Sequence, residues 1–372
     1  MKVSLLKTEQ RIEVPADVSK KIRCYGKGND YPQKILDLKS SSGTLTKCLN
    51  IYFRFVLGRG IEAINNLKVN ENGERLIDLL RLIVYDHTIF GGRAWHVNYN
   101  MNGEIVSIYH IPLEFLRYEI DDERELTGRF VYYDDWNCRK RANVDTSRFV
   151  FINRFNPDNV LNEVESVGGI EKYNGQVLYM SNDGVNTYPT PIYDAVISDI
   201  ATEDGIATIK YRNVKNNYLP SGILTTIGGA KADEEYNNGT IADAIKEMQG
   251  DSAACKILHV EVDRIEEIPK FTPFEVQNFD KEFEYSEKSV QSNIGNIFMQ
   301  PPVLRGELVA GKLGTANEIK DAYDFYNSIT DADRQMIEDD VKLIFSHSVF
   351  NVNLDEIKIW PLNFYGLVNN SQ

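Results

Sequence analysis

The sequence has little that would give it a chemistry of its own. Its four cysteines are scattered, with no C-x-x-C pair, and its five histidines form no pair at the spacing of a metal site. We expect the cysteines to be reduced, buried thiols in a cytoplasmic setting. No G-x-S-x-G motif or Cys–His pairing indicates a hydrolase. We therefore expect no metal, no cofactor and no enzyme activity.

Long apolar runs and an excess of basic residues are also missing. The first residues, MKVSLLKTEQRIEV, lack an apolar stretch of signal-peptide length, and no window approaches the roughly eighteen apolar residues of a membrane span. We expect no membrane partner. The formal net charge is −14, whereas a protein that grips nucleic acid by its phosphates shows a basic face. The chain therefore either has no nucleic-acid partner or acts on nucleic acid without binding it tightly.

One stretch, GELVAGKL at residues 306–313, comes within one residue of the phosphate-binding motif G-x-x-x-x-G-K-[ST]. Leu313 stands where that motif needs a hydroxyl to ligate Mg²⁺. Before the stretch, Pro301 and Pro302 disfavour the required strand. After it, Thr315 and Glu318 form a capping box that begins a helix beyond Lys312. A glycine-flanked loop between two helices is the better interpretation.

The first half of the chain predicts an α+β fold. Residues 33–57 have a helical pattern interrupted by Ser and Gly near 40–43, and the helix in RLIDLLRLIVYDHTIFGG ends at Gly91-Gly92. The period then changes to the alternation of strands. AWHVNYNMNGEIVSIYHI predicts a hairpin about Asn102-Gly103, and further strands in LEFLRYEIDDERELTGRFVYYDDW and SRFVFINRF complete an antiparallel sheet.

Two long helices dominate the second half. The first begins at Pro191 and ends at Leu219-Pro220, and the second runs from about Val276 to Met299. Between them, SGILTTI and CKILHVEV are strand-like and TIADAIKEMQ is a short helix, so that a small strand–helix–strand unit caps a helical stalk; PKFTPF leads out of it. Helices at about 315–329 and 331–346 follow the loop, and DEIKIWPLNFYGL predicts a final strand. The apolar faces of such a stalk need neighbours, which further copies of the chain can supply.

These features in series resemble the tailed-bacteriophage portal protein family, the head-to-tail connectors of the portal vertex. Portal proteins have a helix that ends in an "Ia..fgVPp.llg" pattern, a loop, and then an "E....F....l.P....iE..l" helix pair. The matching residues here are Ile294, Ile297, Phe298, Pro301, Pro302, Leu304, Gly306, Glu318, Phe325, Ile337 and Glu338. Upstream, NNYLPSGILTT and SIYHIPLEFLRYEI resemble two further steps of the family. The departures are Gln300 and a second proline in the "VPp" step, and Ala332 where proline is common.

The resemblance covers nearly the whole chain and implies a portal-type division. Residues 1–190 would be the N-terminal α+β wing, 191–219 and 276–300 the two stem helices, and 220–275 the clip between them. Residues 301–314 would be the tunnel loop, and 315–372 the C-terminal wing helices and strand. A helical crown is expected to be short or absent, since the sequence stops soon after the last predicted strand.

By the same resemblance, the chain forms a ring, usually of twelve copies, at one capsid vertex of a virion, after synthesis in the cytoplasm of the bacterial host. Double-stranded DNA would pass through it without sequence-specific binding during packaging and ejection. The implied partners are the large terminase, capsid and scaffold proteins, and head-completion or adaptor proteins. Two alternatives stay open: a nucleotide-binding protein with a P-loop-like motif, and another oligomeric adaptor of the virion.

Candidate site residues follow from this division. In the stem, acidic residues would keep DNA centred by repulsion, with lysines as partial balance: Lys281, Glu282, Glu284, Glu287 and Lys288. An ordinary solvated helix face is the equal alternative. In the tunnel loop, apolar residues would narrow the channel and charged ones would flank it: Arg305, Glu307, Leu308, Val309 and Lys312. Arg305 and Lys312 would touch phosphates in passing, and a plain surface role is nearly as good an interpretation for either.

The clip is acidic. Residues 220–273 hold ten acidic side chains against five basic ones, which predicts a salt-sensitive contact between a basic surface of the motor protein and Glu234, Glu235 and Glu247. A generally solvated surface is an equal alternative.

The purified protein is expected not to hydrolyse ATP, because Leu313 offers no Mg²⁺ ligand and the following helix begins too late to hold phosphates. A phosphate-release assay on wild type and on Lys312→Ala should give the same background rate. Hydrolysis that disappears in the Lys312→Ala variant would restore the nucleotide-binding alternative.

Overall fold

We describe the protein from a computed structural model, which describes residues 16–136, 144–184, 186–215, 222–227, 257–262, 271–273, 279–307 and 316–364. The chain divides into two compact units. The first combines Met1–Ala195 with Gly295–Gln372, and the second is Val196–Ile294. The second unit is therefore an insertion in the sequence of the first.

The first unit is α+β. Its α-helices within the described residues are α1 (Tyr31–Ser41), α2 (Gly43–Leu57), α3 (Leu76–Phe90), α4 (Val160–Val167), α8 (Ala316–Ile329) and α9 (Asp331–Phe345). The predicted break near 40–43 is confirmed, because Ser42 is extended and its hydroxyl accepts a hydrogen bond from the amide of Leu45, which caps α2. The predicted end of α3 is also confirmed: Gly91 takes the left-handed conformation of a helix C-cap.

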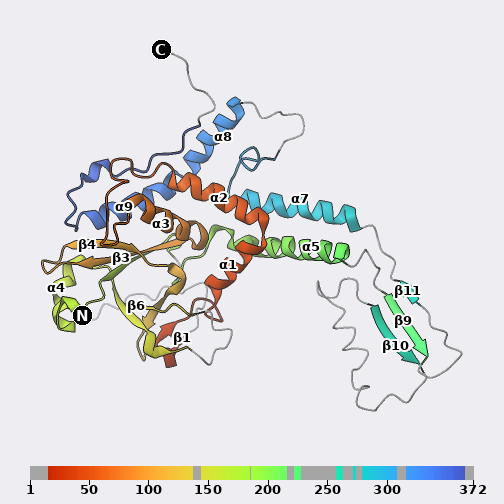
Figure 1. The fold of residues 1–372 in the computed structure, drawn as a ribbon, viewed down its shortest axis with the longest axis horizontal. Helices are drawn as coiled ribbons and strands as arrows, with labels where there is room; N and C mark the ends of the chain where they lie inside the picture. Colours follow the sequence, from red (N-terminus) through yellow and green to blue (C-terminus); the bar gives the residue numbers. More distant parts are fainter. Residues whose placement is uncertain are drawn as a thin grey trace, which may run out of the picture. The chain divides into compact units, whose positions relative to one another are not determined.

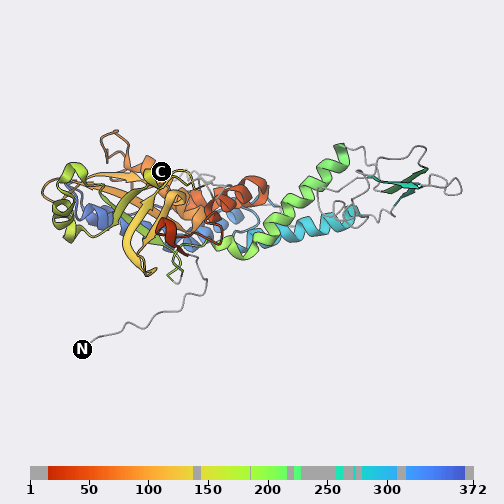
Figure 2. The same ribbon diagram turned by 90° about the horizontal axis from the view of Figure 1, so that it is seen from below.

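Eight strands form one sheet in the order β1-β2-β5-β6-β7-β8-β3-β4. Their bounds are β1 (Ala16–Asp17), β2 (Ile22–Arg23), β3 (Gly92–Tyr99), β4 (Ile105–His110), β5 (Leu116–Ile120), β6 (Leu126–Tyr132), β7 (Val150–Arg154) and β8 (Gln176–Ser181). The helix α3 lies along β3 and β4 and packs against α2, which in turn contacts α9 (Figures 1 and 2). Ten of the fifteen residues of α3 are buried, so this helix is a central part of the hydrophobic core.

The sheet confirms one prediction and corrects another. The hairpin between β3 and β4 turns at Asn102-Gly103, where Gly103 has a φ of +80° that favours glycine. The sheet is mixed and not purely antiparallel, because β7 and β8 are parallel and α4 lies between them in sequence. The prediction missed β8 because its first four residues are all buried and show no alternation.

A buried polar network joins the sheet to α9. Arg93 on β3 forms a buried ion pair with Asp340 of α9, and the indole of Trp95 donates to the same carboxylate at 3.2 Å. The Nη1 of Arg93 lies 3.3 Å from Nδ1 of His87, whose Nε2 lies 3.2 Å from Asp333. Since Arg93 can only donate, His87 is held as the neutral tautomer that donates from Nε2. Burial lowers the pKa of His87.

The predicted final strand is wrong in its described part. Residues Leu354–Glu356 form a short 3-10 helix, and 357–364 run extended without joining a sheet. Their backbone pairs instead with the turn after α2: Arg59 donates to the carbonyl of Trp360 at 2.8 Å, and Trp360 donates to Gly60 at 3.1 Å. A side chain at Gly58 would overlap the carbonyl of Trp360, so only glycine allows this approach.

The second unit contains two long helices, α5 (Ile197–Lys215) and α7 (Phe279–Ile297). The last residues of α7, from Gly295 on, belong to the first unit. The two helices run antiparallel, linked by Asn293 to Asp199 at 3.2 Å and by an ion pair between Lys210 and Glu287. Both predicted helices are thus confirmed. The first starts later than predicted, because residues 192–196 form a 3-10 helix.

A three-stranded sheet, β10-β9-β11, belongs to the second unit. The strands β9 (Gly222–Ile227) and β10 (Ile257–Val262) are the two predicted strands and are parallel. The prediction missed β11 (Phe271–Pro273), which pairs antiparallel with β9. The helix expected in TIADAIKEMQ lies outside the described residues. Among the helices that the structure describes, none is long and apolar enough to cross a membrane.

The neutral state of His87 predicts acid sensitivity. In the unfolded chain, histidine binds a proton near pH 6.5, whereas the folded chain resists protonation at His87 until the pH is lower. Unfolding therefore takes up a proton below this pH, and the free energy of unfolding falls as the pH falls. Urea unfolding between pH 7 and pH 5 should show a smaller loss of stability in His87→Gln than in wild type. His347→Gln is the control, and equal losses in wild type and both variants would contradict the assignment.

Candidate functional site

The structure places part of the predicted site. Six predicted residues lie outside the described part of the chain: Glu234, Glu235, Glu247, Leu308, Val309 and Lys312. The backbone of Lys281 and Glu282 belongs to α7, but their side chains are not described. The geometry below therefore concerns the two helices and the segments on either side of residues 308–315.

The predicted stem charges with described side chains, Glu284, Glu287 and Lys288, are paired within the second unit. Glu284 pairs with Lys288 one turn further along α7 at 2.6 Å, and both side chains are largely exposed. Glu287 pairs with Lys210 across the two helices. Exposed pairs of this kind contribute little to stability, about 0–1 kcal/mol each. They do reduce the negative field of the helices, because each of these two carboxylates has a lysine beside it.

The segment before residue 308 is a tight turn. The helix α7 ends at Ile297, two residues earlier than predicted, and Met299 adopts a positive φ of 52°. Two carbonyls of the proline pair then accept three backbone bonds: Leu304 donates to Pro301, and Arg305 and Glu307 donate to Pro302, each at 3.0 Å. A phosphate-binding loop needs a strand at this place, and the structure has a helix end and a turn.

Gln300 fixes this turn to the body of the first unit. Its side chain is buried, and its amide nitrogen donates to the carbonyl of Cys48 in α2 at 2.7 Å and to the hydroxyl of Tyr326 in α8 at 3.1 Å. Next to it, the ring of Phe298 packs against Tyr52 with 5.9 Å between ring centroids. The residue that departs from the portal pattern thus joins the end of α7 to two other helices.

Arg305 lies in the predicted segment, but its side chain is buried. Its side chain is only 4% exposed, and its Nη2 pairs at 2.9 Å with Glu307, whose side chain is 43% exposed. In this arrangement the guanidinium lies inside the protein, and the contact of Arg305 with DNA stays a prediction. Of these two predicted charges, Glu307 is the one that reaches solvent.

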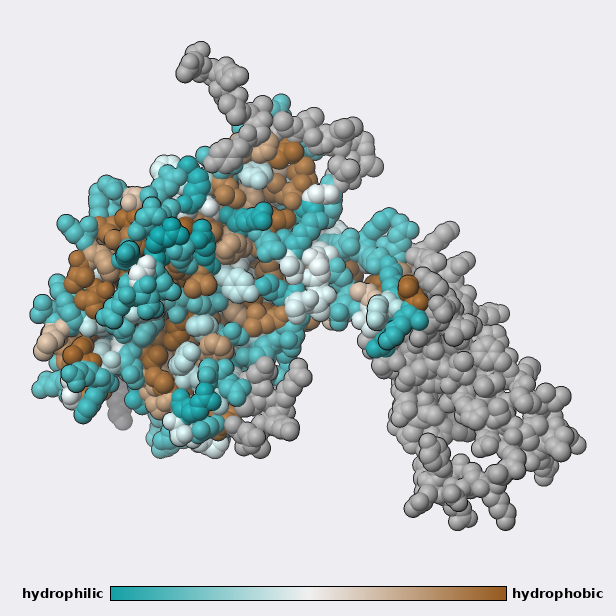
Figure 3. Space-filling view, in the orientation of Figure 1, coloured by the Kyte–Doolittle hydropathy of each residue, from teal (hydrophilic) through white to brown (hydrophobic). Residues whose placement is uncertain are grey.

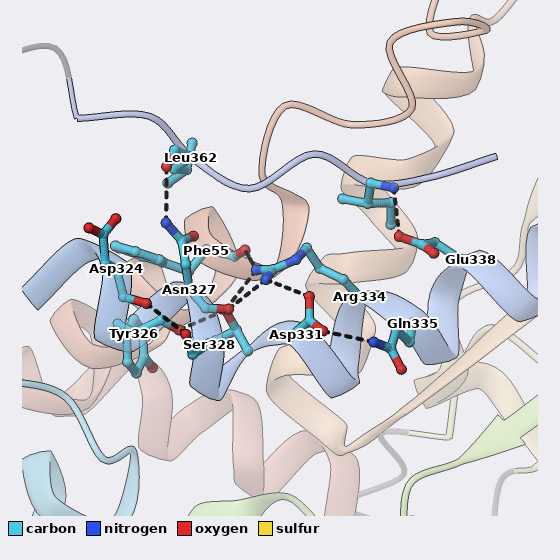
Figure 4. Close-up of polar contacts among 12 residues, drawn as sticks. Phe55, Asp324, Tyr326, Asn327, Ser328, Asp331, Arg334, Gln335, Glu338 and Leu362 are labelled. Atoms are coloured by element: carbon cyan, nitrogen blue, oxygen red, sulfur yellow. Dashed lines mark hydrogen bonds and ion pairs between the residues drawn. The ribbon is translucent and has the colours of Figure 1, made fainter. Parts of the chain in front are cut away.

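The segment after residue 315 is held by Arg334, a residue that the sequence analysis did not single out. Arg334 lies in α9 and is buried. Its Nη1 donates to the carbonyl of Phe55, in the last turn of α2, at 2.9 Å, and its Nη2 donates to the carbonyl of Asn327, in the last turn of α8 (Figure 4). One guanidinium therefore satisfies carbonyls at two helix C-termini, where a positive charge is also favoured by the helix dipole.

Neighbouring bonds extend this attachment to the C-terminal segment. The amide of Asn327 donates to the carbonyl of Leu362 at 3.0 Å, and Glu338 of α9 accepts from the backbone of Ile359 at 2.7 Å (Figure 4). The end of α8, the end of α2, α9 and residues 359–362 thus form one hydrogen-bonded group. We call this group the Arg334 node.

The sequence carried no sign of this role. In DADRQMIEDD, Arg334 stands among acidic residues and looks like part of a solvated helix face. Its carboxylate neighbour Asp331 is indeed half exposed, and the bonds that define its function go to main-chain carbonyls of other helices. Such partners cannot be found by spacing, because they depend on which helix ends meet in the fold.

The contacts on both sides of residues 308–315 are structural ones. Residues 308–315 are preceded by a turn attached through Gln300 and followed by a helix attached through the Arg334 node. Within the described residues, no group of three or more His, Cys, Asp or Glu side chains is arranged to hold a metal ion. The contacts described above attach the segments on both sides of residues 308–315 to helices of the first unit.

No protein-family model matches this chain, and none of the curated proteins matches it. Solved structures do resemble it. The chain is similar to a chain in the neck of the native GTA particle computed with C12 symmetry, at 12% identity and a TM-score of 0.45, over 89% of this chain and 94% of that chain. A chain in the virion of the native gene transfer agent particle matches at 12% identity and a TM-score of 0.43, over 86% and 91%.

The chain is also similar to a crystallised HK97-family phage portal protein from Corynebacterium diphtheriae, at 9% identity and a TM-score of 0.37, over 77% of this chain and 83% of that chain. Each of these three likenesses covers more than three quarters of this chain.

The Arg334 node predicts a large loss of stability on truncation. In Arg334→Met, the carbonyls of Phe55 and Asn327 lose their donor, and each buried unsatisfied group costs roughly 1–3 kcal/mol. We expect urea unfolding to show a loss of about 3 kcal/mol or more. Arg81→Met is the matched control, because Arg81 forms only an exposed pair with Asp78 and its loss should cost about 0–1 kcal/mol. Similar losses in the two variants would show that the node is not a main support of the fold.

Proposed function

We propose that this chain is a phage portal protein, which forms a ring through which double-stranded DNA enters and leaves the capsid. The observation that carries the proposal is the order of its parts. An α+β unit is interrupted in sequence by two antiparallel helices with a small sheet between them, and the chain returns through a proline turn, a loop and a helix pair. This order is the one that the portal motifs imply.

The surface of the first unit supports self-association. Phe325 and Ile329 lie one turn apart on α8, and 52% and 37% of their surfaces are exposed. Figure 3 shows apolar side chains reaching the surface near α8. Apolar groups that lie together on one face of a helix favour burial against a partner, and in a ring that partner is a second copy.

In this proposal residues 301–314 are the tunnel loop, with Leu308 and Val309 narrowing the channel. The two attachments described above suit this role, because a loop that meets moving DNA must not pull its neighbouring helices apart. The acidic balance of the chain suits a channel that DNA slides through. Terminase, the capsid and adaptor proteins would dock on other parts of the ring, and ATP hydrolysis would belong to the motor.

The nucleotide-binding alternative loses its structural basis, because the segment before Gly306 is a helix end and a turn. An oligomeric adaptor remains the second candidate. Negative-stain microscopy of the purified protein separates the candidates most cheaply. A portal gives rings with a central hole, and a protein that stays monomeric at micromolar concentration would count against the proposal.

Deleting Leu308–Ala310 tests the loop itself. The helix ends on both sides keep their attachments at Gln300 and the Arg334 node, so folding and ring assembly should be unchanged. Particles assembled with the variant should retain less nuclease-protected DNA than particles with the wild-type ring. A deletion that abolishes rings while the monomer stays folded would instead make the loop an assembly contact.

A further inference from the structure

The guanidinium of Arg305 fills the space in which a side chain at position 295 would lie. Gly295 lies in the last turns of α7, and a Cβ atom built on it would overlap Nη1 and Cζ of Arg305. The guanidinium therefore lies directly against the bare backbone of the helix. Glycine weakens the interior of a helix relative to alanine, so its presence here needs a reason, and the close approach of Arg305 supplies one.

The buried position of Arg305 is poorly satisfied. Two of its nitrogens, Nε and Nη1, are buried and find no hydrogen-bond acceptor among the described residues. The third, Nη2, pairs with Glu307, which is 43% exposed and therefore partly hydrated. A buried charge is stable only when it is paired and hydrogen-bonded, so this arrangement is favoured only weakly over one in which Arg305 is in water.

We propose that Gly295, Arg305 and Glu307 form a latch that closes the turn at residues 301–307 onto the end of α7. In the closed state Arg305 lies over Gly295 and Glu307 holds it there. In the open state the guanidinium leaves the helix, enters water, and is free to meet an anion such as a phosphate. The buried place of Arg305 and its predicted exposure on the loop are then two states of one side chain.

The latch goes beyond the proposed ring, because all three residues belong to one chain. The start and the end of the turn at residues 301–307 are attached differently. Gln300 keeps the start of the turn attached to α2 and α8 whether the latch is open or closed, so opening moves residues 304–307 and leaves α7 in place. A protein that formed no ring would still carry the latch, and the two proposals fail separately.

Limited proteolysis of the full chain tests the latch directly. Trypsin cleaves the bond after Arg305 only when the side chain can enter the protease, and cleavage follows the population of the open state. Gly295→Ala forces Arg305 out without changing the sequence around the bond. We expect a new terminus at Arg305, identified by mass spectrometry, to form roughly tenfold faster or more than in wild type.

Gly205→Ala is the matched control. Gly205 lies in α5, and a Cβ atom there would meet nothing within 4 Å, so the variant changes helix propensity alone and should be cleaved after Arg305 like wild type. Equal cleavage in Gly295→Ala and wild type would overturn the latch.

A second pair of variants covers the case in which Gly295→Ala does not fold. Glu307→Gln leaves Arg305 unpaired, so the amides of residues 304–307 should exchange hydrogen faster. Adding Arg305→Met replaces the buried charge with an apolar side chain of similar length and should restore slow exchange. Unchanged exchange in Glu307→Gln, or a double variant that exchanges as fast as the single one, would contradict the proposal.

Discussion

A helix that ends inside a protein leaves its last carbonyl groups without donors, and the first unit of this protein brings two such ends together. The ends of α2 and α8 meet at Arg334, and its guanidinium supplies donors to both. Its carboxylate partner, Asp331 at 3.1 Å, is half exposed, so main-chain oxygens and the dipoles of the two helices contribute much of the stabilisation of the charge. This contact fixes the C-terminal end of α8 against the end of α2.

The segment before residue 308 is held in place by a different kind of contact. Pro301 and Pro302 cannot continue a helix, and their carbonyls accept the bonds that make the turn. Gln300 then connects the turn to the same two helices, α2 and α8, that Arg334 joins. The described segments on both sides of residues 308–315 are thereby hydrogen-bonded to the same pair of helices.

Much of the fold was predictable where local chemistry decides it. The break at Ser42, the hairpin at Asn102-Gly103 and the end of α3 at Gly91 each depend on the conformations that those residues favour. The two long helices were predictable because their apolar residues repeat with the helical period.

The rest depends on contacts between distant segments. The strand β8 is buried without alternation, and 357–364 pair with a turn instead of a sheet. Gln300, noted only as a departure from a pattern, and Arg334, hidden in an acidic run, are the two residues that hold the candidate site. Arg305 was noted as a loop residue, but its burial depends on a glycine ten positions earlier in the chain.

The central claim is that residues 308–312 face a channel in a ring of copies. A cryo-electron microscopy reconstruction of the assembled protein, with the channel radius measured along its axis, tests it most directly. The account predicts that the narrowest section lies at Leu308 and Val309, bordered by the turn that Gln300 and Arg305 hold. A ring whose narrowest section lies elsewhere, with residues 308–312 between neighbouring copies or on the outer surface, would contradict it.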